Sequence, residues 1–153
     1  MPPTHVRYEV DGWGVGEMWI EGDRLLHHEL PRLGLTANGE THPLADRLAG
    51  YFASGVGDFG DVELDLEGAS AFERDLTAAL RRVPPGETVT YGELAALAGR
   101  PSAQRAAGTF CARNRFGIVV PCHRVIAASG LGSYGSLGVG YKRRLLELEG
   151  VAV

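Results

Sequence analysis

The sequence has little cysteine and no long apolar run. Its 153 residues include two cysteines, Cys111 and Cys122, which are too few for a disulfide-stabilised secreted domain or for a zinc site of four thiolates. The first ten residues contain no apolar stretch of signal-peptide length, and no run is long enough to span a bilayer. We therefore expect a cytoplasmic protein with reduced thiols and no membrane contact.

Basic residues are scarce in the first half of the chain. The formal net charge is -4, but residues 1–69 carry 4 basic and 13 acidic residues, whereas residues 70–153 carry 11 and 6. With 44% hydrophobic residues the chain has enough apolar material for a core. The split indicates an acidic scaffold joined to a basic half that would attract a phosphate backbone, although uneven scatter of surface charge is the alternative.

The first half has the pattern of a small sheet followed by a helix. Short alternating segments between residues 5 and 30, separated by glycine-containing turns, predict a strand meander. Residues 33–42 read as a loop, 43–54 as a helix that ends at Gly55, and 62–66 as an edge strand. The composition changes near Gly68, which predicts a scaffold domain over 1–69 and a second domain over 70–153.

The second half is typical of a helix-turn-helix. Ser70 can cap one helix, and Thr90 with Glu93 forms a capping-box pair that opens a short second helix. After a turn containing glycine and proline, Ser102 is placed to cap a third helix that runs to about Arg113. Two short helices joined by a tight turn predict the DNA-binding motif.

Basic and small residues share the last of these helices. Arg105 falls in its first turn, from which side chains reach base edges, and Ala106 and Gly108 would allow close approach to a groove. Arg113 lies nearby, and no acidic residue occurs from 94 to 146. This favours a nucleic-acid interface over the alternative, an alanine-rich helix packed on the core.

Cys122 follows an apolar run that predicts a buried strand over residues 118–120. A thiol becomes a good nucleophile as a thiolate, and the adjacent His123 and Arg124 could lower its pKa. A base also needs an orienting partner. The candidate carboxylates are Glu147 and Glu149 on the C-terminal amphipathic helix. The alternative is an inert core cysteine, which Cys111 is expected to be.

Residues 119–126, VVPCHRVI, resemble the signature of the O6-alkylguanine-DNA alkyltransferases, also called methylated-DNA-protein-cysteine methyltransferases. The resemblance extends in order over residues 70–150, through PGET, TYGELA and AQRAAG upstream and LLELEG downstream. It implies an α+β fold with an N-terminal antiparallel β-meander and helix, ribonuclease H-like. It also implies a C-terminal, mostly helical, winged-helix-like helix-turn-helix domain that carries the active-site cysteine.

The activity that the resemblance implies is direct reversal of DNA damage. Members of this family bind duplex DNA in the minor groove and flip the damaged base into a pocket. An alkyl group passes from O6 of guanine, and by extension O4 of thymine, to the cysteine. The thioether product is not cleaved, so each molecule acts once. We expect no cofactor, a monomer, and a bacterial-type cytoplasmic protein that associates with the nucleoid through its DNA.

The resemblance also implies catalytic roles for four residues. Cys122 is the alkyl acceptor, and His123 is the base that takes its proton through a water. Glu149 orients the imidazole, and Asn114 braces the active-site turn.

Further residues are implied in DNA binding and in the pocket. Arg105 fills the place of the flipped base, Tyr91 assists its rotation, and the Val125 carbonyl recognises its exocyclic amine. The expected DNA-binding residues are Tyr91, Arg105, Ala106, Gly108 and Arg113. The expected pocket residues are Tyr91, Val125, Tyr134 and Ser136.

Several positions depart from the family pattern. Arg115 follows Asn114 where proline is usual, and Gly117 replaces a proline over the pocket, which predicts room for bulkier O6 substituents. The loop after Gly130 is one residue short, and Ser136 interrupts a customary pair of glycines. Some relatives bind zinc in the N-terminal half. That half has no cysteine here, so we predict no metal, with His27, His28 and His42 as surface or turn residues.

Three other functions remain as alternatives. A non-catalytic alkyltransferase-like protein would bind damaged DNA, but those relatives replace the acceptor cysteine and generally lack the N-terminal domain. A Cys-His hydrolase would not need Tyr91 and Arg105 in a helix-turn-helix. A ligand-sensing transcription factor would leave the signature around Cys122 unexplained.

Overall fold

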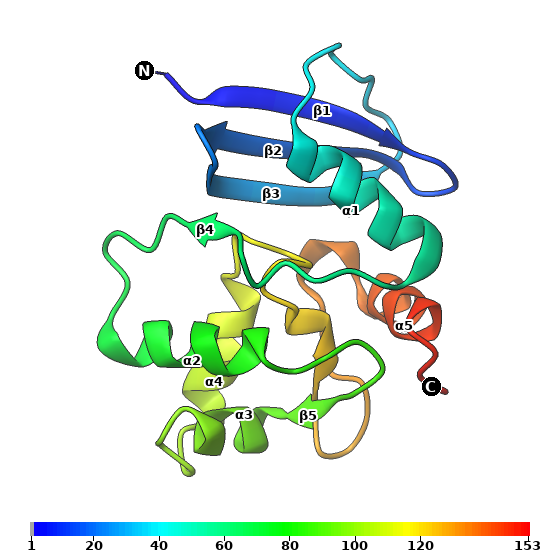
Figure 1. Cartoon of the computed structure of the whole chain (residues 1–153). Coiled ribbons are helices and arrows are strands. Elements are labelled where there is room, and N and C mark those ends of the chain that lie inside the picture. The colour runs from blue at the N-terminus through cyan, green and yellow to red at the C-terminus, as the bar shows by residue number, and fades with distance from the viewer. Residues whose placement is uncertain (1) are drawn as a thin grey trace. The chain divides into compact units, whose positions relative to one another are not determined.

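The computed structural model describes residues 2–153, and they form two compact units (Figure 1). The first unit comprises the chain up to Asp65 together with Arg115–Val119, and the second comprises Leu66–Asn114 and Val120–Val153. The chain therefore leaves the second unit after Asn114 and returns to it at Val120. The expected domains, 1–69 and 70–153, stay a prediction, because spatial grouping does not show which part folds by itself.

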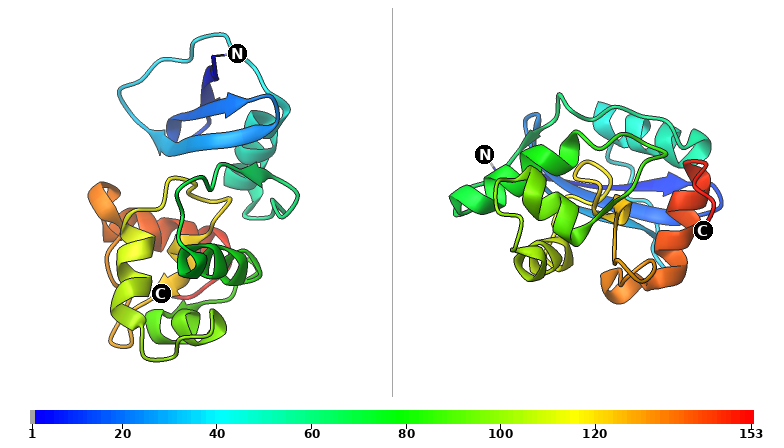
Figure 2. Two further views of the ribbon diagram at one scale, coloured as in Figure 1. Left: turned by 90° about the vertical axis from the view of Figure 1, so that its left-hand side faces the viewer. Right: turned by 90° about the horizontal axis from the view of Figure 1, so that it is seen from below.

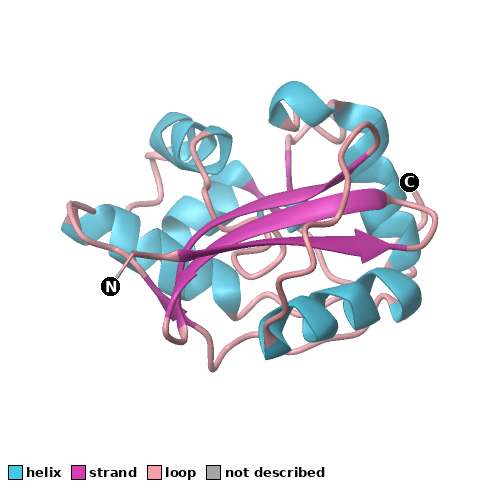
Figure 3. Ribbon diagram, turned by 90° about the horizontal axis from the view of Figure 1, so that it is seen from above, coloured by secondary structure: helices cyan, strands magenta, loops and turns pink. Residues whose placement is uncertain are grey.

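The first unit is built on a sheet, whose strands are magenta in Figure 3. It has four strands in the order β1-β2-β3-β4, as labelled in Figure 1. Strands β1 (Thr4–Val10), β2 (Gly14–Glu21) and β3 (Arg24–Arg32) form an antiparallel meander. The short β4 (Glu63–Leu64) pairs in parallel with the edge of β3. The structure thus confirms the predicted meander and the predicted edge strand.

Helix α1 (Pro43–Ser54) contacts β1 of the sheet. It begins with proline at its first turn, where the ring removes no helical hydrogen bond, and the His42 side chain accepts a hydrogen bond from the Leu44 amide at its start. Gly55 ends it with a left-handed φ of 75°, which glycine adopts without strain. Leu48 and Tyr51 are fully buried, and the prediction for residues 43–54 is confirmed.

Residues 115–119 run beside β3 as part of the first unit. The His28 amide donates to the Arg115 carbonyl oxygen at 2.8 Å, and the Arg115 guanidinium donates to the carbonyls of Leu26 and Asp65 at 3.2 and 2.8 Å. The strand predicted over 118–120 is wrong, because these residues form a turn in which Ile118 has a φ of 72°. A short apolar run indicates burial but does not specify backbone conformation.

Gly117 lies against Leu30 in this unit. A Cβ atom at Gly117 would sit 2.1 Å from Leu30 Cδ1, well inside van der Waals contact. The space that the missing side chain leaves is therefore filled by leucine. The expected extra room at Gly117 is wrong, and this glycine gives no structural reason for tolerance of bulkier substituents.

The second unit begins with helix α2 (Ala71–Arg81), followed by β5 (Val89–Thr90) and α3 (Tyr91–Leu97). Ser70 and Thr90 each accept a hydrogen bond from the third helical amide, and the glutamate at that position reaches back to the cap amide. Both capping boxes satisfy amides that a helix start would leave unpaired. They confirm the predicted starts of these two helices.

Helix α4 (Gln104–Ala112) contacts α3, as a helix-turn-helix requires (Figure 2). Its N-cap is Ala103, which makes no side-chain cap hydrogen bond, so the cap predicted at Ser102 is wrong. The turn instead closes through backbone bonds, among them the Ala103 amide to the Arg100 carbonyl at 3.0 Å.

The rest of the second unit is a loop-rich segment and a final helix. A 3-10 turn η1 (Cys122–Arg124) leads into β6 (Val125–Ile126), which pairs in parallel with β5. A second 3-10 turn η2 (Gly135–Leu137) precedes α5 (Val139–Leu148). Together the two units confirm the predicted α+β class. None of the helices in residues 2–153 is long and apolar enough to cross a membrane.

His28 is buried within β3, so its expected place at the surface or in a turn is wrong. His28 is 3% exposed, and its Nδ1 lies 2.7 Å from the Gly117 carbonyl oxygen. A carbonyl only accepts, so Nδ1 carries the proton and Nε2 accepts from the Tyr8 hydroxyl. Burial lowers the pKa of His28 from 6.5 to about 4.

We expect acidification to destabilise the protein through His28. Between pH 6.5 and 4 the unfolded chain binds a proton at this site that the folded chain does not, so stability is complete above pH 6.5 and falls as the pH drops. The loss approaches about 3 kcal/mol. Chemical denaturation at pH 7.5 and 4.5 measures it. His28→Gln, which keeps hydrogen-bonding groups but does not titrate, should lose less stability across this interval; an equal loss in both proteins would contradict the assignment.

Candidate active site

Cys122 opens the turn η1 and is held by its backbone. Its amide donates to the Val120 carbonyl at 2.8 Å, and its residue is 4% exposed. The same carbonyl accepts a hydrogen bond from Asn114 Nδ2 at 2.8 Å. Asn114 therefore holds the backbone that leads into Cys122. The sequence analysis expected this residue to brace the same turn.

The residue after the cysteine contacts the carboxylate of Glu149, which directly follows the last helix. His123 Nε2 and Glu149 Oε2 lie 2.7 Å apart, and both side chains are 0% exposed. In the neutral ring the proton is on Nε2, because the carboxylate can only accept, and the lone pair is on Nδ1. Of the two glutamates that the sequence offers as partners, the structure selects Glu149; Glu147 is exposed.

Arg124 shares this carboxylate, which sequence reasoning did not foresee. Its Nε and Nη2 donate to Glu149 at 2.9 and 2.8 Å, and its Nη1 donates to the Val83 carbonyl at 2.7 Å. The expected action of Arg124 on the cysteine is therefore wrong, because its charge is directed to Glu149. In the sequence, the only indication of a role for Arg124 at this site was its position next to His123.

The ionisation states of the two neighbours differ from their usual ones. Burial raises the pKa of the Cys122 thiol well above its ordinary value, while the hydrogen bond of Asn114 and the charge of Lys142 act in the opposite direction. Burial lowers the pKa of His123, against the opposing effect of Glu149. The resting pair is thus a thiol followed by a neutral imidazole that can accept a proton.

Lys142 is a fully buried lysine on α5, with 0% exposure. Its Nζ donates to the Val125 carbonyl at 2.6 Å and to the Ser133 carbonyl at 3.3 Å, and lies 5.7 Å from the centre of the Tyr91 ring. Burial lowers its pKa. Lys142 thus joins the two ends of the loop between Val125 and Ser133. Lys142 precedes Leu145 and Leu146 by three and four residues, so the sequence places it on the apolar face of the helix. A lysine at such a position could have been recognised as a candidate functional residue.

The structure places the pocket residues of the sequence analysis on several elements of the second unit. Tyr91 begins α3 and its hydroxyl lies close to Gly132, where a Cβ atom would be 3.1 Å away. Tyr134 precedes η2 with its ring 6.3 Å from that of Tyr141, and Ser136 is exposed within η2. Lys142 links Tyr91 to Val125, to whose carbonyl it donates.

Four of the five expected DNA-binding residues lie along α4 and at its end, whereas Tyr91 begins α3. Arg105, Ala106 and Arg113 are exposed and Gly108 is half-buried, with a Cβ at Gly108 approaching Tyr91 at 4.0 Å. Ala107, between them, is 0% exposed. The helix therefore has one face in the core and another, bearing the arginines, in solvent.

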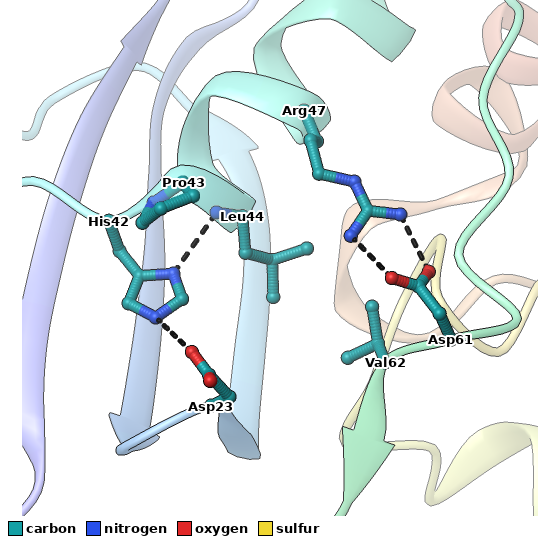
Figure 4. Close-up of a pocket in the computed structure, with 7 residues that line it drawn as sticks. All are labelled: Asp23, His42, Pro43, Leu44, Arg47, Asp61 and Val62. Carbon is teal, nitrogen blue, oxygen red and sulfur yellow. Dashed lines mark hydrogen bonds and ion pairs between the residues drawn. The ribbon is translucent and has the colours of Figure 1, made fainter.

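A cavity of about 270 Å³ lies in the first unit, lined by Asp23, His42, Pro43, Leu44, Arg47, Asp61 and Val62 (Figure 4). Arg47 forms a bidentate pair with Asp61 across it, at 2.7 and 3.1 Å. None of the predicted site residues lines this cavity. Within residues 2–153 no group of three histidine, cysteine or acidic side chains is arranged to hold a metal ion; the absence of zinc stays a prediction.

Known proteins are similar to this chain in sequence. The family model "6-O-methylguanine DNA methyltransferase, DNA binding domain" matches residues 71–151. A methylated-DNA--protein-cysteine methyltransferase of Mycolicibacterium paratuberculosis is 47% identical over 124 residues, which are 80% of this chain and 73% of the relative.

Solved structures resemble the whole chain. The O6-methylguanine methyltransferase of Mycobacterium tuberculosis is 34% identical, with a TM-score of 0.81 over 96% of this chain and 92% of that one. A crystal structure of Mycobacterium tuberculosis OGT in complex with DNA is 36% identical, with a TM-score of 0.77 over 95% and 92% of the two chains. The chain belongs to the O6-methylguanine DNA methyltransferase family, a family of enzymes named for methyl transfer to a protein cysteine.

We expect Glu149→Gln to be destabilised by about 3 kcal/mol or more, because it leaves the buried Arg124 without its anion and weakens the bond to His123. Urea denaturation at neutral pH measures the loss. Glu147→Gln, the same change at an exposed position two residues earlier, is the matched control and should fall within about 0.5 kcal/mol of the parent. Equal stabilities for the two variants would show that Glu149 does not support the site.

Proposed function

We propose that this chain repairs duplex DNA by transferring an alkyl group from O6 of guanine to Cys122. The observation that carries the proposal is a buried cysteine followed in the chain by a neutral imidazole that a carboxylate holds, in the unit that also contains the helix-turn-helix. Membership of the methyltransferase family supports the same reaction. By extension O4-alkylthymine, which presents an alkyl group on a similar oxygen, is a second substrate.

The reaction is a displacement at the alkyl carbon. His123 takes the thiol proton through a water, the sulfur forms a bond to carbon, and the bond from carbon to O6 breaks with its electron pair left on the base. The base takes up a proton and becomes ordinary guanine. The thioether on Cys122 offers no leaving group to water, so the protein acts once and needs no cofactor.

The damaged base reaches Cys122 by flipping out of the duplex. The small and basic face of α4 enters the minor groove, Arg105 fills the vacated stack, and Tyr91 assists rotation of the nucleotide. Arg113 and the backbone beside Ala106 and Gly108 contact the strand. Exposure of Arg105 at the start of α4 supports this assignment.

The Val125 carbonyl recognises the exocyclic amine of the flipped guanine. A carbonyl oxygen has two lone pairs, and Lys142 occupies one of them. Lys142 thus orients the acceptor and leaves one position for the base. Tyr134 and Ser136 complete the pocket. The protein acts as a cytoplasmic monomer, and DNA is its partner.

Intact-mass analysis after incubation with an O6-methylguanine duplex tests the acceptor. The parent protein should gain one methyl group in place of one hydrogen, in proportion to the lesion supplied, and should not act again. Cys122→Ala should gain nothing, whereas Cys111→Ala should still be methylated. An unchanged mass in the parent with retained DNA binding would favour the non-catalytic alkyltransferase-like alternative.

Arg105→Ala separates base flipping from chemistry. We expect transfer from duplex DNA to slow by about tenfold, equal to about 1.4 kcal/mol in the barrier, because no side chain replaces the extruded base. Transfer from free O6-benzylguanine, which leaves no stack to fill, should not change. Arg143→Ala, an exposed arginine on α5, is the control for general loss of charge. Equal slowing with both substrates would contradict the role of Arg105.

A further inference from the structure

The two cysteines of the chain occupy one site in the second unit. Cys111 lies near the end of α4 and Cys122 opens η1. The Asn114 amide donates to the Cys111 carbonyl at 3.2 Å, and its side chain donates to the Val120 carbonyl, which also accepts from the Cys122 amide. One asparagine therefore ties the backbones of both cysteines together. The side chain of Cys111 also acts on the Cys122 thiol, whose pKa it helps to raise after the larger effect of burial.

The two thiols differ in their access to solvent. Cys111 is half-buried, whereas Cys122 is 4% exposed. A small oxidant in solution therefore meets Cys111 first, and the buried sulfur of Cys122 is already beside it. An accessible cysteine next to a second, resolving cysteine is the arrangement found in reversible thiol oxidation.

We propose that peroxide converts Cys111 and Cys122 into a reversible disulfide that withholds the acceptor sulfur. The Cys111 thiolate attacks a peroxide oxygen, which breaks the O–O bond and gives a sulfenic acid and water. The Cys122 sulfur then attacks the sulfenic sulfur, and a second water leaves with the thiol proton. Two thiols and one hydrogen peroxide thus yield one disulfide and two waters, and a small dithiol reverses the change.

The disulfide itself does not depend on the proposed alkyl transfer, but its effect on repair does. A sulfur bound to another sulfur has no thiolate to attack an alkyl carbon. Since Cys122 is used once, oxidation beyond the sulfenic state would waste the molecule irreversibly. A disulfide that a cytosolic reductant opens would protect it.

Tryptic mapping provides a direct test, because Arg113 and Arg115 separate the two cysteines into peptides 106–113 and 116–124. The full-length reduced protein is treated with one equivalent of hydrogen peroxide, and remaining thiols are blocked in denaturant. We expect a loss of two hydrogens in intact mass and a linked pair of these two peptides, removed by dithiothreitol. Cys111→Ser should form no linked pair and should instead accumulate oxygen on Cys122.

Methyl acceptance is measured on the same samples. Oxidised protein should accept at least tenfold less methyl from the O6-methylguanine duplex and should recover with dithiothreitol, whereas oxidised Cys111→Ser should not recover fully. Oxygen on both cysteines without a linked pair, or a pair linked only between two molecules, would overturn the disulfide. A linked pair with undiminished acceptance would overturn the regulation. Reduced protein that never accepts a methyl group would instead refute the proposed function and leave the disulfide standing.

Discussion

The carboxylate of Glu149 is the contact on which the site of the second unit depends. It follows directly after α5 and accepts hydrogen bonds from His123 and Arg124, two consecutive residues of η1. The residue that ends the last helix therefore holds the turn that carries Cys122. A carboxylate with 0% exposure is costly to bury unless it is paired, and here two cationic or proton-donating groups share it. Its charge also keeps the imidazole in the tautomer whose lone pair lies on Nδ1.

A second constraint comes from buried donors that hold backbone carbonyls. Lys142 binds the carbonyls of Val125 and Ser133, Arg124 binds that of Val83, and Asn114 binds that of Val120. These segments have little regular secondary structure, since η1 and β6 together span five residues. Side chains therefore supply hydrogen bonds that sheet or helix would supply elsewhere. The result is a loop region with a defined course around the thiol.

Much of the fold could be predicted from local signals. The meander, α1 with its Gly55 end, and the capping boxes at Ser70 and Thr90 all depend on residues within a few positions of each other. Two of the errors have the opposite property. The turn at Ile118 and the close packing of Gly117 on Leu30 depend on β3, which lies far away in sequence. An apolar run of three residues is too short to show a periodicity, and it does not indicate that the segment packs on β3.

The residues of the site also separate into those that the sequence could predict and those that it could not. Cys122 and His123 are adjacent in sequence, so their pairing could be proposed from the motif, and the resemblance singled out Glu149. The contacts that Arg124 and Lys142 make could not be predicted. Arg124 is as close in sequence to Cys122 as a basic activator could be, yet its guanidinium is held by Glu149 and Val83. Lys142 is twenty residues away and does act on the thiol. Proximity in sequence therefore identifies the nucleophile and its base, whereas tertiary contacts set the charges around them. The pKa of Cys122 is raised by burial and by Cys111, and Asn114 and Lys142 oppose that shift.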